Sequence, residues 1–180
     1  MHKVLVPLAQ GCEELETVTI IDLLRRAQIE VVTAGLDSQT ITASRGVVII
    51  PDTDLDTALK DDYDMIVLPG GLPGAVHLGN DERIKDILIK MANSEKFTAA
   101  ICAAPKVLAD AGILDNKKAT SYPGFLDEAK NTKVSNDAVV IDGKVITSRG
   151  PGTAMDFALT LIESLEGKEK RDEVEKGLVR

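Results

Sequence analysis

The chain has 180 residues, of which 44% are hydrophobic and 28% are charged. These proportions are typical of a globular protein and exclude an intrinsically disordered chain. The formal net charge is −8 and no basic patch is visible, so nucleic acid and anionic membrane surfaces are not expected partners. The length predicts a single domain over residues 1–180.

Cysteine and histidine are too scarce for a disulfide framework or a metal site. The only cysteines are Cys12 and Cys102, which fits a reducing compartment. They and the histidines, His2 and His77, lack the spacing of zinc ligands. No apolar run of about 18 residues is present. The apolar stretch of Met1–Leu8 has the length of a strand, not of a signal peptide. We therefore expect a cytoplasmic protein without a membrane span, metal or cofactor.

Short β-branched apolar runs alternate with longer segments of helical periodicity. In the first half, these patterns predict a strand over Val4–Leu8, a helix over Glu13–Ala27, a strand over Ile29–Ala34, a hairpin of Ile41–Ala43 with Val47–Ile50, and a strand over Met65–Leu68. In the second half, they predict a helix over Asp81–Ser94 with Asp81 as N-cap, a strand over Thr98–Ile101, a helix over Pro105–Ala111, a hairpin of Ala138–Ile141 with Val145–Thr147, and helices over Thr153–Glu166 and Lys168–Arg180.

Two local details follow from the same patterns. Asp142-Gly143 predicts a type I′ turn in the second hairpin. The first helix has its apolar residues at a spacing that suits packing on a sheet: Leu15, Val18, Ile21, Leu23 and Leu24.

Strands alternating with helices indicate βαβ units and a mainly parallel sheet covered on both faces. The predicted fold class is α/β, a flavodoxin-like three-layer sandwich. Ligands in such folds bind beyond the C-terminal ends of the parallel strands. Three strand ends carry chemically interesting residues: Leu8 leads into Gln10–Glu16, Leu68 into Gly70-Gly71, and Ile101 into Cys102.

Cys102 stands between a buried strand and a helix with Pro105 in its first turn. The small residues around it permit a sharp turn like the nucleophile elbow of hydrolases, although the flanking glycines of that motif are absent. A helix N-terminus favours the thiolate and lowers the thiol pKa. The alternative is a buried structural cysteine, and the position alone leaves both interpretations open.

Two further strand ends supply groups that suit a reactive thiol. Backbone N–H groups of Gly70-Gly71, with that of Ala103, can form an oxyanion hole; a plain turn is the alternative. Glu13, Glu14 and Glu16 stabilise a helix start, and one of them can hydrogen-bond a neighbouring thiolate as a protonated carboxyl. The residue pattern does not choose among the three.

Three more positions have open roles. His77 is a possible base or a solvated loop histidine, and Cys12 is a second thiol or a small buried residue. The Ser148–Thr153 segment is a turn before a helix or part of the wall of the same site.

Several motifs in order match a known family. They are Gly11–Val18, Ile21–Ala27, Ser44–Val48, Tyr63-Asp64, Val67–Gly71, Ala99–Pro105, Thr147–Thr153 and Phe157–Leu159. With them, nearly the whole chain resembles the ThiJ/PfpI superfamily, within it the branch of the DJ-one deglycases and their bacterial YajL-like members.

This resemblance implies a homodimer and assigns roles to individual residues. It implies Cys102 as the elbow cysteine, Glu16 as the protonated glutamate beside it, and Gly71 and Ala103 as backbone donors. It also implies an anion site of Arg26 and Arg45 at the dimer interface. Gly70, Tyr122 and Pro151 are the expected lining of the pocket.

The implied activity is a cofactor-independent glyoxalase III or deglycase reaction on methylglyoxal-like dicarbonyls or early glycation adducts, through Cys102 and Glu16. The alternative is an oxidative-stress sensor or redox-regulated chaperone whose Cys102 is oxidised to a sulfinate. Two departures bear on the chemistry. Ala103, not histidine, follows Cys102, which argues against a peptidase, and Tyr122 replaces a histidine found in human-type members.

Overall fold

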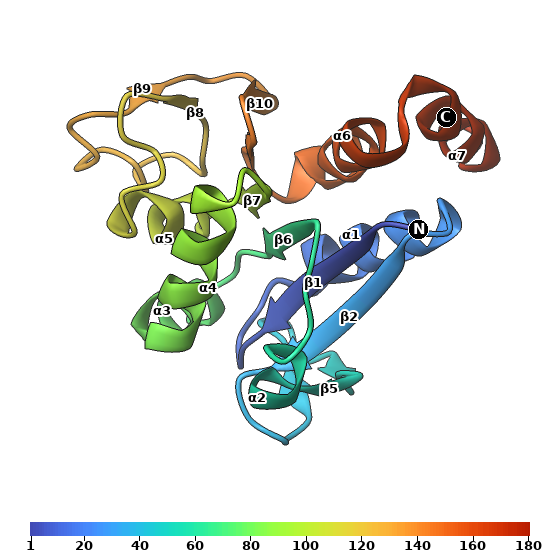
Figure 1. Ribbon diagram of the computed structural model, residues 1–180, viewed down its shortest axis with the longest axis horizontal. Coiled ribbons are helices and arrows are strands. Elements are labelled where there is room, and N and C mark those ends of the chain that lie inside the picture. The colour runs from blue at the N-terminus through green and yellow to red at the C-terminus, as the bar shows by residue number, and fades with distance from the viewer.

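The computed structural model describes residues 1–180 and has a seven-stranded sheet at its centre (Figure 1). The sheet order is β10-β11-β7-β6-β1-β2-β5, and all neighbouring pairs except β10–β11 are parallel. The strands are β1 (Lys3–Leu8), β2 (Glu30–Gly35), β5 (Thr53–Asp54), β6 (Met65–Leu68), β7 (Phe97–Ile101), β10 (Val139–Asp142) and β11 (Val145–Ser148).

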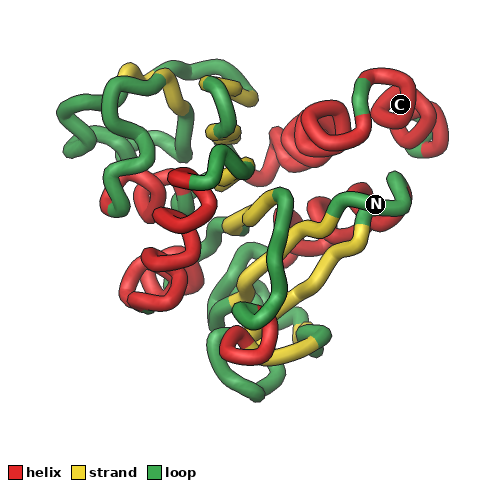
Figure 2. Tube along the Cα trace, viewed as in Figure 1, coloured by secondary structure: helices red, strands yellow, loops and turns green.

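Helices cover both faces of the sheet, which confirms the predicted three-layer α/β fold (Figure 2). One face is covered by α1 (Glu14–Arg26), α6 (Ala154–Glu166) and α7 (Lys168–Gly177). The other is covered by α2 (Leu55–Ala58), α3 (Gly74–Asn80), α4 (Glu82–Asn93) and α5 (Pro105–Asp110). Strand β1 shows why two cores form, because Val4 and Val6 belong to one apolar cluster and Leu5 to the other.

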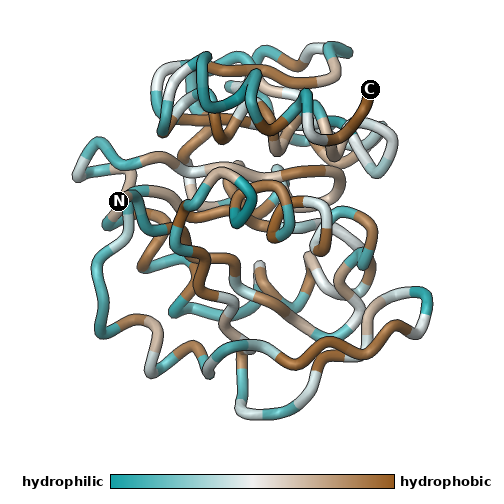
Figure 3. Tube along the Cα trace, turned by 90° about the vertical axis from the view of Figure 1, so that its right-hand side faces the viewer, coloured by the Kyte–Doolittle hydropathy of each residue, from teal (hydrophilic) through white to brown (hydrophobic).

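Small elements complete the chain outside the central sheet. Strands β3 (Ile41–Thr42) and β4 (Val48–Ile49) form the predicted antiparallel hairpin. Strands β8 (Lys118–Ala119) and β9 (Lys133–Val134) form a parallel pair, and a 3₁₀ turn, η1 (Pro151–Thr153), precedes α6. Hydropathy along the trace alternates between hydrophobic and hydrophilic stretches in the outer elements (Figure 3). No helix has the length and apolar character needed to cross a membrane.

Most predicted elements are confirmed to within a few residues. Asp81 caps α4 as predicted, because its side chain accepts a hydrogen bond from the backbone N–H of Arg83. The sequence did not reveal α2, α3, β5, β8 and β9, which are too short to show a period. The predicted type I′ turn is wrong. Because β10 ends at Asp142 and β11 begins at Val145, the two central residues of the turn are Gly143 and Lys144. A type I′ turn requires positive φ at both, and although Gly143 has φ of 64°, Lys144 has no positive φ.

The apolar residues predicted to pack α1 on the sheet are confirmed only in part, because Leu23 and Leu24 are buried but two others are exposed. Leu15 and Val18 are 51% and 50% exposed. Ile20, Leu23 and Leu24 face the core. Helix α1 therefore has one apolar face against the sheet and a second one exposed.

The topology brings the predicted strand ends together. Strand β1 pairs with β2 on one side and with β6 on the other, so the direction of winding reverses between β1 and β6. Leu68 at the end of β6 pairs with Ala100, and Ser148 at the end of β11 pairs with Ile101. Loops that follow these strands thus meet at one edge, where ligands bind in open α/β sheets.

Candidate active site

Cys102 occupies a sharp turn between β7 and α5. Its φ is 64°, a left-handed conformation that is costly for a residue other than glycine. The turn is fixed on both sides, because the Cys102 N–H donates to the Ser148 carbonyl at 3.0 Å and the Cys102 carbonyl accepts from the Tyr122 N–H at 2.8 Å. Pro105 begins α5 directly beyond. The predicted elbow is present, and the cysteine remains 9% exposed.

The three glutamates at the start of α1 have different surroundings. Glu16 is fully buried, and its Oε2 accepts a hydrogen bond from the Gly70 N–H at 2.9 Å. Glu13 caps α1 through the Leu15 N–H and accepts from the Ser44 hydroxyl. The Glu14 carboxylate accepts hydrogen bonds from the Ser44 hydroxyl and the Arg45 N–H, which join α1 to the turn of the β3–β4 hairpin. Of the three, the structure therefore places Glu16 at the thiol.

Gly70 allows Cys102 and Glu16 to approach each other. A Cβ at Gly70 would lie 2.7 Å from Cys102 Cβ and 2.8 Å from Glu16 Oε2. A Cβ atom essentially never lies this close to another non-bonded heavy atom, so a side chain at position 70 would displace Cys102 or Glu16. The absence of a side chain at Gly70 is what brings the thiol and the carboxyl to the same point.

Two backbone N–H groups lie close to the sulfur and lower the pKa of the thiol. They belong to Gly71 and Ala103, the donors expected from the sequence. Gly71 has φ of 93°, and a Cβ there would lie 2.3 Å from the Glu13 nitrogen. The Glu13 N–H in turn donates to the Gly70 carbonyl at 2.9 Å. The glycine loop therefore packs backbone to backbone on the start of α1, which fixes the position of the Gly71 N–H.

Burial and mutual charge determine the protonation of the pair. Burial raises the pKa of Glu16 to about 7, although the hydrogen bond from Gly70 lowers it. Glu16 Oε1 is buried without a hydrogen-bond partner, which disfavours the charged form. Burial also raises the pKa of Cys102, and an ionised Glu16 raises it further, while the N–H groups of Ala103 and Gly71 lower it.

This result corrects the expectation that the helix start alone lowers the thiol pKa. Helix α5 is only one and a half turns long by its six residues, and burial with the carboxylate charge outweighs it. Protonation of Glu16 removes that charge and leaves an O–H donor beside the sulfur. Once the pair has lost one of its two protons, the location of the remaining proton, on the carboxyl or on the sulfur, decides whether a thiolate forms.

Tyr122 is joined to the Cys102 elbow through its backbone, and Pro151 follows the glycine that the Tyr122 ring contacts; their role as pocket lining stays a prediction. The Tyr122 N–H is bonded to Cys102, and its ring is 49% exposed. The ring lies against Gly150, whose Cβ position is 3.4 Å from Tyr122 Cδ2, and Pro151 follows directly. The ring also makes an edge contact with Phe125, with 6.2 Å between centroids.

Other candidates lie elsewhere. His77 is exposed on α3 and lines a separate hollow with Gln10 and Asp37, so its position does not support a role as the base. Arg26 ends α1 and pairs with Asp22 at 2.7 Å, whereas Arg45 lies beside Glu14 at the opposite end of that helix. Within one chain, the two arginines cannot form one anion site.

Cys12 is completely buried and free. Burial raises its pKa, and the Thr17 side chain is a close neighbour that lowers it in part. The backbone around Cys12 packs on Gly74, whose Cβ position is 2.6 Å from the Cys12 nitrogen. Of the two interpretations of Cys12, a second thiol of the site or a small buried residue, these surroundings support the second.

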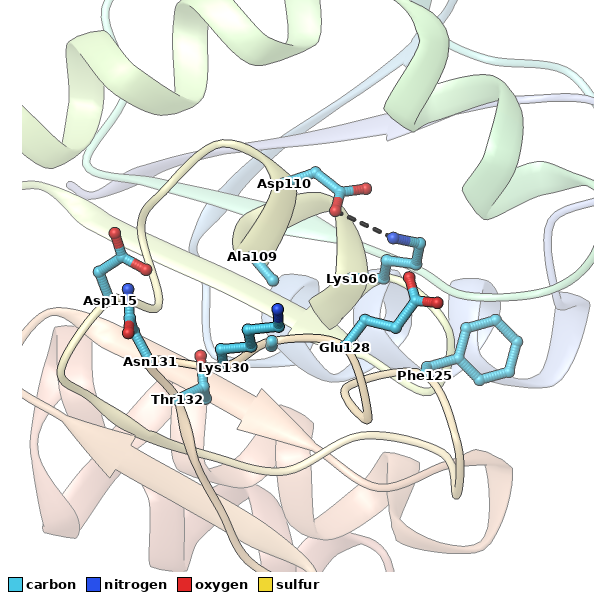
Figure 4. A pocket seen from close by; sticks show the side chains of 10 residues that line it. Lys106, Ala109, Asp110, Asp115, Phe125, Glu128, Lys130, Asn131 and Thr132 are labelled. Atoms are coloured by element: carbon cyan, nitrogen blue, oxygen red, sulfur yellow. Dashed lines mark hydrogen bonds and ion pairs between the residues drawn. The ribbon is translucent and has the colours of Figure 1, made fainter.

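Sequence reasoning missed the cavities between α3, α5 and the segment before β9. One is an apolar groove of about 120 Å³ that includes Leu72, Val76, Ala103 and Phe125. Its neighbour, of about 250 Å³, is polar and is crossed by the Lys106–Asp110 ion pair (Figure 4). Local periodicity did not indicate them, because the predicted helix α5 forms only one wall of each. The other walls come from α3, which was not predicted, and from the irregular segment before β9.

Comparisons with known proteins agree with the overall fold. The DJ-1/PfpI family matches residues 2–164. The chain belongs to the DJ-1/PfpI family. Protein dj-1beta of Drosophila melanogaster is 47% identical over 97% of this chain and 95% of its own length. The crystal structure of that DJ-1/PfpI protein superposes with a TM-score of 0.95, covering 99% of this chain and 97% of the other.

Two further DJ-1/PfpI relatives bear on function. The glutathione-independent glyoxalase DJR-1.2 of Caenorhabditis elegans is 36% identical over 94% of this chain and 91% of its own length. The structure of oxidized DJ-1 of Toxoplasma gondii has a TM-score of 0.94 at 39% identity, covering 99% of this chain and 98% of the other. Membership of this family, with a glyoxalase among its members, supports an enzyme of glyoxalase type.

Proposed function

We propose that this protein converts methylglyoxal and related α-oxoaldehydes into 2-hydroxy acids without a cofactor, with Cys102 as nucleophile and Glu16 as general acid and base. The observation that carries the proposal is the junction at Gly70, where the elbow thiol and the buried carboxyl flank one glycine. The glyoxalase of Caenorhabditis elegans supports the choice of substrate.

The reaction begins with addition of the Cys102 sulfur to the aldehyde carbon. A C–S bond forms, the C=O π bond breaks, and the oxygen takes a proton from Glu16, which gives a hemithioacetal. Glu16 carboxylate then removes the hydrogen of the former aldehyde carbon as a proton. The resulting enediolate takes this proton back from Glu16 at the neighbouring carbon, and the hydroxyl proton passes from the first oxygen to the second, which gives a thioester of a 2-hydroxy acid.

Water then hydrolyses the thioester, releases the acid and restores the thiol. The sum is R–CO–CHO plus water to R–CH(OH)–COOH, in which the aldehyde carbon is oxidised and the ketone carbon reduced. The reaction needs no external oxidant or reductant. The raised pKa of Glu16, about 7, lets this residue both donate and accept a proton near neutral pH.

The N–H groups of Gly71 and Ala103 lie near the place where negative charge develops. They approach the sulfur in the resting site and are placed to stabilise an oxyanion on the adjoining carbon. Loss of one such donor typically costs about 10²–10³ in rate. Reversal of early glycation adducts is a finer form of the proposal, since a hemithioacetal-type adduct at Cys102 can also form from a glycated aminocarbonyl.

The decisive experiment measures lactate formed from methylglyoxal in the absence of glutathione. Wild type should form lactate over many turnovers, and Cys102→Ser should form none above the uncatalysed rate. Stoichiometric loss of methylglyoxal, or equal loss with the variant, would refute the enzyme proposal.

A second candidate function is redox sensing, or a chaperone activity controlled by oxidation of Cys102. It is favoured by the partial exposure of Cys102 and by the relative that was studied in an oxidized form. A sulfinate at Cys102 would find N–H donors at Gly71 and Ala103 and an O–H donor at Glu16. Intact-mass spectra after mild peroxide should show two added oxygens that Cys102→Ser abolishes; oxidation confined to methionine would count against the sensor.

We also propose a homodimer in a reducing, cytoplasmic compartment, which the two free thiols fit. Exposed apolar side chains lie on α1 and on the hairpin bonded to it: Leu15, Val18, Val47, Val48 and Ile50. Such a patch is typical of a protein interface. A second chain is also required if Arg26 and Arg45 are to share one anion.

The proposed dimer is tested by its mass in solution. Light scattering should give twice the chain mass for wild type, and Val48→Asp should give monomers. A monomeric wild type would refute the dimer.

A further inference from the structure

An apolar groove begins beside the Cys102 elbow and runs between α3 and α5. It encloses about 120 Å³, and its apolar lining includes Leu72, Val76, Val107 and Phe125. Ala103 forms part of the wall, and its N–H lies close to the Cys102 sulfur. Leu72 directly follows Gly71, the second donor to that sulfur. The groove therefore starts at the place where the proposed reaction occurs.

The walls of the groove are fixed relative to the thiol. Helices α3 and α5 approach closely at Gly79, whose Cβ position is 3.5 Å from Val107 Cγ2. Phe125 makes an edge contact with Tyr122, whose backbone is bonded to Cys102. Leu72 and Val76 remain 53% and 50% exposed, so their apolar surface is available to a ligand.

Charged side chains also line the groove. Lys106 and Asp110, paired at 2.9 Å, line both the groove and the adjoining pocket of about 250 Å³ (Figure 4). The walls of that pocket are mostly polar: Asp115, Glu128, Lys130, Asn131 and Thr132 among them. The apolar part of the groove is therefore bordered by charged and polar side chains.

We propose that this groove binds the apolar substituent of the substrate, so that the enzyme prefers α-oxoaldehydes with an aromatic ring or a branched alkyl group. The inference rests on the proposed function and names its substrate class. The groove, at about 120 Å³ and open to solvent, is of the same order as the enclosed apolar cavity of about 150 Å³ that accommodates benzene, so a ring can lie in it while part of the ring stays exposed. Transfer of such a group from water to the apolar walls supplies the driving force.

The test compares kcat/KM for phenylglyoxal and for methylglyoxal in wild type, Val76→Asp and Val76→Phe. The first variant places a charge in the groove, and the second fills it. An aspartate is compatible with the fold here, because position 76 lies in the first turn of α3. Ile89→Asp on α4 is the matched control, since it puts the same charge on an exposed helix face outside the groove.

Both Val76 variants should lower the phenylglyoxal to methylglyoxal ratio of kcat/KM by about tenfold or more, and Ile89→Asp should leave it unchanged. The ratio cancels the different intrinsic reactivity of the two aldehydes. A ratio that stays constant in both Val76 variants would overturn the proposal, whatever happens to the absolute rates.

Binding of the products separates this proposal from the proposed function. Calorimetry should give a dissociation constant for mandelate at least about tenfold below that for lactate in wild type, with the preference lost in Val76→Phe. If neither aldehyde is turned over, the proposed function fails, and the product-binding preference still decides on the groove. Equal dissociation constants in wild type, or a preference that survives Val76→Phe, would refute the subsite.

Discussion

The two cysteines show how different surroundings separate two identical groups. Both follow parallel strands, both are buried, and burial raises the pKa of both thiols. Cys12 is enclosed by backbone and has a threonine as its neighbour. Cys102 has a left-handed backbone, a buried glutamate beside it and two N–H groups close to its sulfur. Burial is common to both cysteines, so the strained turn and the neighbouring buried carboxyl are what distinguish the reactive thiol from the packing residue.

The largest expected effect comes from removing each cysteine in turn. Cys102→Ala should lower lactate formation about 10³-fold or more, because the nucleophile is lost. Cys12→Ala should keep turnover within about threefold and lower the free energy of unfolding by about 1 kcal/mol. Steady-state kinetics and urea unfolding check both. A large kinetic effect of Cys12→Ala would mean that this thiol takes part in the chemistry.

The next largest effect is expected at Glu16, the buried carboxyl that lies beside Cys102. Glu16→Gln keeps the shape of the side chain and removes proton transfer, so kcat should fall by about 10²–10⁴. Glu13→Gln is the matched control, because Glu13 caps α1 and should affect kcat by less than about threefold. If the two variants behave alike, the assignment of Glu16 is wrong.

Gly70→Ala tests whether the junction itself matters. The added methyl would overlap Cys102 Cβ and Glu16 Oε2. We expect a loss of about 1–3 kcal/mol in unfolding free energy and a drop of about 10² in kcat from the displaced groups. Gly177→Ala in α7 is the control, since nothing lies within 4 Å of its Cβ position. Unchanged turnover by Gly70→Ala would show that the contact is dispensable.

The last effect is a pH dependence of stability, which changes no residue and leaves the site intact. Because burial raises the pKa of Glu16 from 4.5 to about 7, the folded state retains a proton that the unfolded state releases in this range. The contribution is complete below about pH 4.5 and is lost as the pH rises through about 7, up to about 3 kcal/mol in all. Urea unfolding between about pH 5 and pH 7 should show this slope in wild type and a flatter one in Glu16→Gln. Parallel curves would contradict a raised pKa.

The sequence could have indicated Glu16 more directly than it did. Glu16 and Ile20 are one helical turn apart, and both lie on the buried face of α1. Leu15 and Val18 obscured that face, because they are apolar and yet exposed. The orientation of a helix on a sheet depends on all its contacts, so local periodicity could not choose between two apolar faces.

What the sequence determined by itself is the order of strands and helices and the place of the Cys102 elbow. Alternating strand and helix patterns imply parallel strands with their C-terminal ends at one edge, which puts Gly70, Cys102 and the start of α1 near each other. Only the tertiary structure decided which glutamate faces the thiol, how charge and burial set the two pKa values, and that a groove adjoins the site. These depend on distances of a few ångströms between segments far apart in the chain, which local patterns do not encode.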